Sequence, residues 1–266
     1  MTPNKTIGKD ELKTIQLNIL KDVHAFCELN HIKYFLTYGS LIGAIRHNGF
    51  IPWDDDIDIA MPRPDYIRFV NSYHSDRYEV LSLANVPYFP LAYAKITDKR
   101  TSLLENFYHQ YDFGVNIDLF PIDGLPDDIS ESHTHYNKLR NLRYLRLIKI
   151  LKPSHAKSFP KKALLLFAKA ILSFYPYSQI VKRTNELLLK YNYDDCEFVA
   201  DMNFGNASRR IHKSVFSSVE KHQFEDCLLN IPVGYDSYLR SIYGDYMKLP
   251  PIEQQKSNHY FDAHWK

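Results

Sequence analysis

The sequence predicts an α+β protein, with a mixed β-sheet and flanking helices first and a helical half after it. Apolar residues recur at three- and four-residue steps in 10–27, which is typical of an amphipathic helix. They alternate with polar residues in 57–61 and 114–121, as they do in half-buried strands. From Glu131 onward the pattern is helical again. We therefore expect a sheet-containing catalytic core over 1–130 and a helical subdomain over 131–266.

The individual elements follow from the same two periodicities. Short apolar runs bounded by Gly, Pro or Asp indicate strands, whereas longer runs with a 3.6-residue repeat indicate helices. The predicted strands are 33–37, 57–61, 78–82, 93–97, 101–105 and 114–121. The predicted helices are 10–27, 41–46, 63–73, 131–151, 161–174 and 178–191.

Composition narrows the class of protein. The three cysteines are widely spaced and form no Cys-x-x-Cys pair, which argues against a disulfide framework and a cysteine zinc site. The first residues are polar and charged, unlike a secretory signal. No apolar run approaches the roughly 20 residues that span a bilayer. We therefore expect a cytoplasmic protein in a reducing compartment.

Four acids, Asp54, Asp55, Asp56 and Asp58, lie close together before an apolar strand. Because alternate side chains of a strand share a face, Asp56 and Asp58 would point away from the core. Neighbouring carboxylates repel unless one is protonated or a cation lies between them. Carboxylate oxygens suit Mg²⁺ or Mn²⁺, so this run predicts a divalent-metal site.

A Gly-Ser turn precedes the acids. Gly39 and Ser40 join the predicted strand 33–37 to the helix 41–46, with Ser40 expected as its N-cap. The free N–H groups of a helix N-terminus commonly bind phosphate. A phosphate site beside a metal site points to metal-assisted chemistry at a phosphoryl group.

Two further polar residues interrupt apolar strands. Asp118 alternates with apolar residues in 114–121, where an acid is costly unless it is paired or liganded. It either caps a turn before Pro121 or is a third carboxylate beside Asp56 and Asp58. Lys95 likewise is either a solvated lysine of the sheet or a side chain that reaches the site. The residues alone leave both alternatives open.

At this point a family resemblance becomes clear. The runs 38–47 (YGSLIGAIRH) and 51–59 (IPWDDDIDI) resemble the LicD family. Asp118 before Phe-Pro and Asp-Gly is similar to the family pattern, as is 231–251, which continues to a histidine, here His259. The resemblance covers nearly the whole chain and is weakest in the lysine-rich middle.

The resemblance implies a nucleotidyltransferase-like fold and a phosphotransferase. Bacterial members move phosphocholine from CDP-choline onto cell-surface glycans, and the animal fukutin-related proteins move ribitol phosphate. It implies release of CMP and a glycan acceptor of the lipopolysaccharide, teichoic acid or capsule type, assembled on a lipid. The residues expected to be catalytic and to bind Mg²⁺ or Mn²⁺ are Asp56, Asp58 and Asp118. Those expected to bind the nucleotide and its phosphates are Tyr38, Gly39, Ser40, Arg46, Lys95 and His259.

Other functions use the same residues. The transferred group could instead be ribitol phosphate, glycerol phosphate or phosphoethanolamine, or the nucleotide itself with loss of pyrophosphate. A non-catalytic metal-dependent protein that binds nucleotides or glycans would differ only in lacking turnover. A calcium loop is excluded because its sixth position must be Gly and is Ile59 here. A serine hydrolase is disfavoured because Ser40 is not in a Gly-x-Ser-x-Gly elbow.

Charge is segregated along the chain. The segment 132–185 contains no Asp or Glu but twelve cations, around the apolar run 163–174. It lacks the aromatic interleaving of RNA-binding modules, so no nucleic-acid partner is expected. Either the run packs on the sheet and the cations are solvated, or the segment attaches to an anionic membrane at its inner face. Each cation near such a surface contributes roughly 1 kcal/mol. The cations are Lys138, Arg140, Arg143, Arg146, Lys149, Lys152, Lys157, Lys161, Lys162, Lys169, Lys182 and Arg183.

Overall fold

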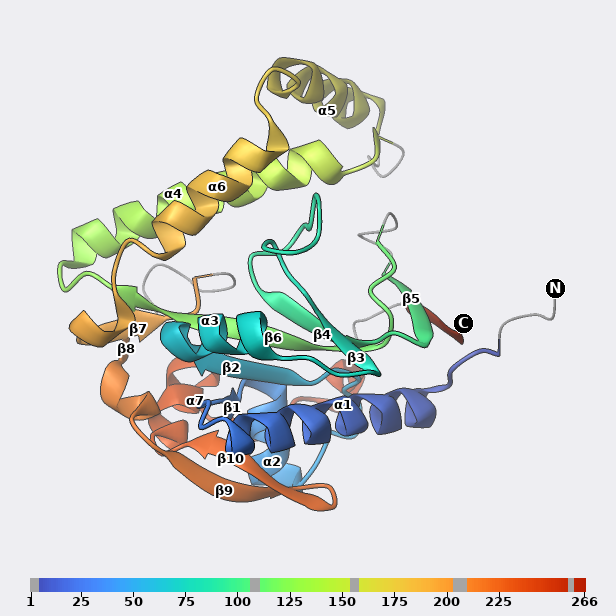
Figure 1. The fold of residues 1–266 in the computed structure, drawn as a ribbon, viewed down its shortest axis with the longest axis vertical. Coiled ribbons are helices and arrows are strands. Elements are labelled where there is room, and N and C mark those ends of the chain that lie inside the picture. Colours follow the sequence, from blue (N-terminus) through green and yellow to red (C-terminus); the bar gives the residue numbers. More distant parts are fainter. Residues whose placement is uncertain (1–4, 106–110, 154–157, 203–209, 258–260) are drawn as a thin grey trace.

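The computed structural model describes residues 5–105, 111–153, 158–202, 210–257 and 261–266. Helices and strands are interspersed around a mixed sheet, so the predicted α+β class is confirmed (Figure 1). The helices are α1 (Lys9–Leu29), α2 (Tyr38–His47), α3 (Arg63–Ser72), α4 (Ile129–Ile150), α5 (Phe159–Leu172), α6 (Tyr177–Leu188) and α7 (Tyr235–Tyr243). The strands are β1 (Phe35–Leu36), β2 (Asp58–Pro62), β3 (Tyr78–Leu81), β4 (Ala94–Asp98), β5 (Thr101–Glu105), β6 (Asn116–Leu125), β7 (Phe198–Ala200), β8 (Ile211–His212), β9 (Val219–Phe224), β10 (Cys227–Pro232) and β11 (Phe261–Trp265).

The central sheet is built around the long strand β6. The strand order is β1-β2-β6-β4-β3, and β7 and β8 extend the sheet beyond the second part of β6. The pair β2–β6 is parallel and the other pairs of this sheet are antiparallel. The first part of β6 therefore lies between β2 and β4, where it aligns residues from three strands.

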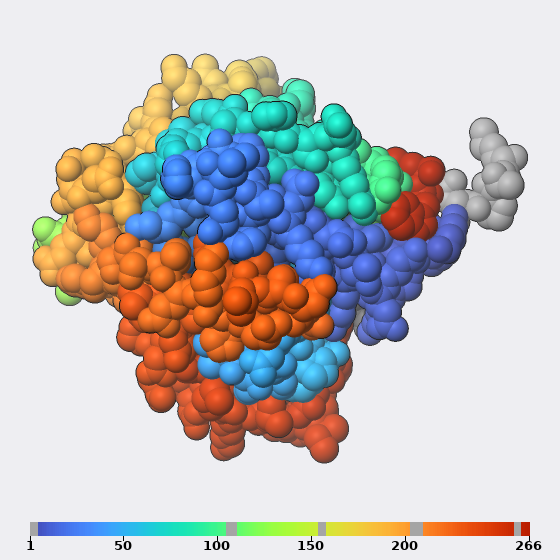
Figure 2. All heavy atoms as spheres, turned by 60° about the horizontal axis from the view of Figure 1, so that its bottom comes forward, coloured from blue at the N-terminus to red at the C-terminus, as the bar shows by residue number. Residues whose placement is uncertain are grey.

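Helix α1 packs on the sheet with the apolar stripe that its sequence predicts. Leu12, Ile15, Ile19 and Val23 are all buried in the main hydrophobic core. The hairpin of β9 and β10 packs against β1 on the same part of the molecule. Figure 2 shows α2 and the turn after it, in light blue, enclosed between the orange hairpin and the red C-terminal segment.

Helices α4, α5 and α6 form an arm above the sheet (Figure 1). A small separate core joins α4 and α6 to β6 and β7. Its buried members are Leu125, Leu139, Leu187, Leu188, Ala200 and Met202. The prediction of a helical second half is therefore confirmed for α4 to α6 and, farther along, for α7. It is wrong for the rest of that half, where β7 returns to pair with β6 and further strands follow. The division at residue 130 stays a prediction.

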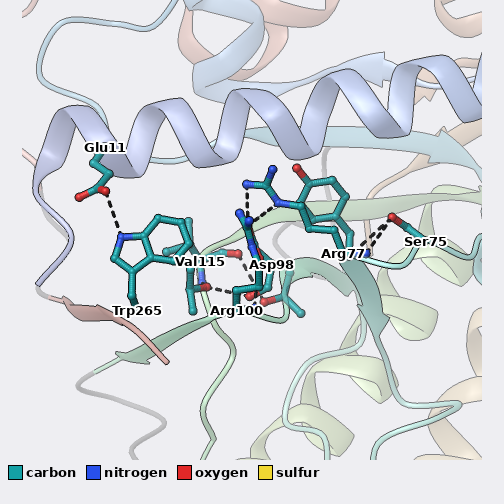
Figure 3. Close-up of polar contacts among 10 residues, drawn as sticks. Glu11, Ser75, Arg77, Asp98, Arg100, Val115 and Trp265 are labelled. Atoms are coloured by element: carbon teal, nitrogen blue, oxygen red, sulfur yellow. Dashed lines mark hydrogen bonds and ion pairs between the residues drawn. The ribbon is translucent and has the colours of Figure 1, made fainter. Parts of the chain in front are cut away.

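An ion-pair cluster lies at the end of strand β4. Asp98 at the end of β4 has no exposed surface and accepts hydrogen bonds from Arg77 and Arg100 (Figure 3). Burial alone would raise the pKa of Asp98, but these hydrogen bonds outweigh it and lower the pKa. Trp265 of β11 donates to Glu11 of α1 nearby, which ties the C-terminal strand to the first helix.

Candidate active site

Three charged side chains form a row across the sheet. Asp58 of β2 is the register partner of Asp118 of β6, and Asp118 is the register partner of Lys95 of β4. Lys95 Nζ donates to Asp118 Oδ1 at 2.7 Å and to Asn116 Oδ1 at 3.0 Å. Lys95 is only 5% exposed, so it is not a solvated lysine of the sheet. Asp118 lies inside β6 with a buried cation beside it, so it does not cap a turn.

The loop before β2, 54–57, carries the remaining acids. Asp54, Asp55 and Asp56 each place a carboxylate oxygen within 4.8 Å of the others. Asp56 and Asp58 are half-buried while Ile57 and Ile59 are buried, as the alternation predicts. Burial, followed by the carboxylates of three neighbouring aspartates, raises the pKa of Asp58 well above its usual range. Those neighbours are Asp56, Asp118 and Asp54, and Lys95 opposes them.

This group of acids suits a hard divalent cation. Its donors are carboxylate oxygens, the ligands that Mg²⁺ and Mn²⁺ prefer. Burial and then the neighbouring carboxylates raise the pKa of Asp58, and a cation among these acids would offset their repulsion. Asp54 and Asp55 belong to the predicted acid run but were not named as ligands, and they have the same chemistry as Asp56. The run of three consecutive acids was the signal that could have included them.

Two distant residues hold the acid loop. Gln16 of α1 donates from Nε2 to the carbonyl oxygens of Asp55 and Asn116, at 3.1 Å and 3.2 Å. Ser257 donates from its hydroxyl to Asp55 Oδ2. No local pattern in the sequence indicates either contact. Together they connect the loop to the first helix, to β6 and to the C-terminal segment.

The start of α2 differs from the prediction. The helix begins at Tyr38 with Thr37 as its N-cap, so the prediction that Ser40 is the N-cap is wrong. Tyr38 itself has φ 46°, in the left-handed region that a bulky residue rarely adopts. Ser40 Oγ instead accepts a hydrogen bond from the backbone N–H of Asp58 at 2.8 Å. The helix start is therefore fixed to the first residue of β2.

The two glycines of the motif have different roles. A Cβ on Gly39 would lie 2.7 Å from Asp54 Oδ2, so the helix start and the acid loop touch there. A Cβ on Gly43 would lie 2.4 Å from the backbone oxygen of Gly49. The first contact is with a side chain that can move, whereas the second is with the backbone of a turn.

We expect Gly39→Ala to lower activity and Gly43→Ala to lower stability. The extra methyl at 39 displaces the Asp54 carboxylate, while that at 43 must push the turn at Gly49 away from α2. The second change should cost about 1–3 kcal/mol, as overpacking does. Thermal midpoints and turnover of both variants test this. A Gly39→Ala variant with wild-type turnover would show that the Asp54 position is unimportant.

Tyr38 links the helix start to the second part of the sheet. Its hydroxyl donates to Asp201 Oδ2 at 2.6 Å, and its ring meets Phe120 edge-on with centroids 5.4 Å apart. Burial, and then the Asp201 carboxylate, raise the pKa of Tyr38, so the phenol remains a donor. A small cavity of about 20 Å³ lies here, and Thr37, Tyr38 and Asp201 are among its lining residues. Asp201 was not predicted, because it follows β7 far along the chain.

Arg46 and His259 are not brought to the acids by the described contacts. Arg46 lies in the last turn of α2 and donates from Nη1 to the backbone oxygen of Tyr246 at 2.6 Å. Its Nε donates to His47, whose ring meets Trp53 edge-on beside the acid loop. His259 lies outside the described residues. The roles predicted for both stay predictions.

Comparisons with known proteins agree with the motifs. The family model described as LicD/FKTN/FKRP, nucleotidyltransferase domain, matches residues 31–163. The chain is 33% identical to a lipopolysaccharide cholinephosphotransferase LicD of Haemophilus influenzae, over 98% of this chain and 99% of that protein. An uncharacterised protein of Rickettsia typhi is 45% identical over 60 residues, 22% of this chain and 19% of that protein. On the strength of the near full-length match and the family model, the chain belongs to the LicD family.

Proposed function

We propose that this protein transfers phosphocholine from CDP-choline to a sugar hydroxyl of a cell-surface glycan of the lipopolysaccharide type, with release of CMP. The main support is the near full-length similarity to a protein named for cholinephosphotransfer to lipopolysaccharide. The acid loop and the row of Asp58, Asp118 and Lys95 supply the chemistry that such a transfer needs. The nucleotidyltransferase-like fold is part of the same proposal.

The donor is a diphosphate, and its negative charge cannot approach these acids without a cation. Mg²⁺ or Mn²⁺ held by Asp56, Asp58 and Asp118, with Asp54 within reach, would offset that charge and polarise the phosphoryl group. Ser40 can still donate its hydroxyl hydrogen, because its oxygen serves as the acceptor for Asp58 N–H. The first N–H groups of α2, with Gly39, would bind a phosphate oxygen. Tyr38 holds this helix start in place through Asp201.

The chemical step is a direct displacement. The sugar oxygen forms a bond to the phosphorus next to choline, and the bond from that phosphorus to the bridging oxygen breaks, so that CMP leaves with this oxygen. Asp118 accepts the proton of the sugar hydroxyl, as a general base does. Lys95, bonded to Asp118 at 2.7 Å, holds that carboxylate in place and brings positive charge to the reacting phosphoryl group. Arg46 and His259 are proposed to neutralise charge on the donor.

The experiment is to incubate the protein with Mg²⁺, a lipopolysaccharide acceptor and one CDP-alcohol at a time. We expect CMP release with CDP-choline, dependent on both acceptor and metal and abolished by a chelator. CDP-ethanolamine, CDP-ribitol and CDP-glycerol are the matched donors. A preference for one of these donors would mean that its group, and not phosphocholine, is the one transferred. Pyrophosphate release from CTP would indicate nucleotidyl transfer, and binding without any turnover would indicate a sensor.

We also propose that the reaction takes place in the cytoplasm, at the inner face of the cell membrane where a lipid-linked acceptor is exposed. The three cysteines, Cys27, Cys196 and Cys227, are all free in the structure, which fits a reducing compartment. Fractionation of cells that express the tagged protein tests this location. Recovery of the active protein from an oxidising compartment would contradict it.

A further inference from the structure

Helix α5 exposes an apolar surface that nothing in the described structure covers. None of its residues is buried. Its exposed side is formed by large apolar side chains, and Phe174 just after the helix is 91% exposed. Scattered apolar residues on a surface are ordinary, but a contiguous set on one helix marks an interaction site. The exposed set is Phe159, Leu164, Leu166, Phe167, Ile171 and Phe174.

Helix α5 turns only a narrow, partly covered face towards the rest of the protein. The partly covered residues are Leu165, Ala168, Lys169 and Leu172, which recur at three- and four-residue steps and so share one face. On that face Lys169 Nζ donates to the backbone oxygen of Lys149 in α4, so one of the three lysines of the helix points towards α4. Three apolar residues share this partly covered face, whereas the larger exposed apolar side chains face solvent. Because no residue of α5 is buried, the run does not pack on the sheet.

The charge around α5 has one sign. Lys161 and Lys162 are exposed in its first turn, and the segment 132–185 contains no Asp or Glu. An exposed apolar face on a helix that also carries exposed lysines is complementary to the acyl region and the anionic head groups of a membrane. A surface that bound a second protein through its apolar face alone would not need this one-sided charge.

No single described helix is long and apolar enough to cross a bilayer, although α5 and the segment Tyr177–Asp195 meet that test together, with a bend of 84°. Helix α6, which begins that segment, buries Ile180, Leu187 and Leu188 in the protein, two of them in the small core with α4 and β7. Crossing the membrane would require breaking that packing. A helix that lies in the surface requires no such change.

We propose that α5 is a membrane-surface anchor that binds anionic lipid bilayers with its exposed apolar face inserted and Lys161 and Lys162 against the head groups. The helix lies on the side of the molecule opposite the hairpin of β9 and β10 (Figure 1). This inference rests on the surface of α5 and does not depend on the identity of the transferred group.

The test is sedimentation of the whole protein with vesicles of phosphatidylcholine alone or with added phosphatidylglycerol, at low and high salt. We expect binding only to the anionic vesicles and weaker binding at high salt, because salt screens the attraction. Phe167→Ser with Ile171→Ser should weaken binding about tenfold or more. Lys161→Glu with Lys162→Glu should remove the preference for anionic lipid.

The matched control is Leu29→Ser with Leu228→Ser, which removes two apolar residues that are 80% and 56% exposed elsewhere on the protein. Binding should be unchanged in that variant. Equal binding to both vesicle types, or no binding, would overturn the proposal. So would a dimer in light scattering that the Phe167→Ser, Ile171→Ser variant loses, because a second copy would then cover α5. Turnover on a soluble acceptor, measured in parallel, keeps this result separate from that of the proposed reaction.

Discussion

Asp58→Asn is expected to lower turnover by on the order of 10²-fold or more while leaving the thermal midpoint unchanged or raised. A metal ion contributes several kcal/mol of charge stabilisation, and each 1.36 kcal/mol is tenfold in rate. Asp58 is surrounded by other carboxylates, and burial with these neighbours raises its pKa. A raised pKa means that the ionised form costs folding free energy at neutral pH. Asp58→Asn therefore removes this cost in folding free energy and, at the same time, removes a metal ligand.

CMP release and thermal unfolding of the same preparation measure the two effects. Asp226→Asn is the matched control, since Asp226 forms an exposed ion pair with Lys21 and lies outside the site. We expect wild-type turnover from it. Near-normal turnover of Asp58→Asn would remove Asp58 from the metal site. A large loss of stability would show that Asp58 is structural.

Local patterns predicted the acid loop well, because strand periodicity depends only on neighbouring residues. Ile57 and Ile59 are buried and Asp56 and Asp58 are half-buried, as alternation requires. Periodicity could not decide whether Lys95 is a solvated lysine of the sheet or reaches the site. It depends on the register of β4 against β6, which is set by the whole sheet.

The start of α2 shows a different limit. Ser40 is a good N-cap residue by type, but the helix begins earlier, at Tyr38, whose φ is left-handed. A bulky aromatic residue gives no sequence signal for that conformation. Asp201 and Gln16 were missed for another reason, because each reaches the site from an element that is distant in the sequence. The outward face of α5 was also hidden, because a run that is apolar nearly all round does not indicate which side is covered.

Arg63→Ala is expected to destabilise the protein by roughly 3–5 kcal/mol, the usual cost of breaking a buried ion pair. Arg63 at the start of α3 forms two hydrogen bonds to Asp123 of β6, at 2.5 Å and 2.9 Å. The side chain of Asp123 is 1% exposed and that of Arg63 is 12% exposed. Burial raises the pKa of Asp123, and Arg63 opposes this rise. Without Arg63 the carboxylate stays buried with its charge uncompensated. In a chain of this size the thermal midpoint should fall by on the order of 10 °C.

The pH dependence distinguishes this mechanism from lost packing. In Arg63→Ala the pKa of Asp123 rises further, so the folded state binds a proton more readily than the unfolded state. Stability relative to wild type should then recover as pH falls from 7 towards 5. Arg183→Ala is the control, because its ion pair with Glu186 is largely exposed and should change the midpoint little. Replacing both partners, Arg63→Met with Asp123→Leu, should cost less than Arg63→Ala alone, since no charge remains buried. If the double variant lost as much stability as Arg63→Met and Asp123→Leu lose separately when added together, the pair would not act as a unit.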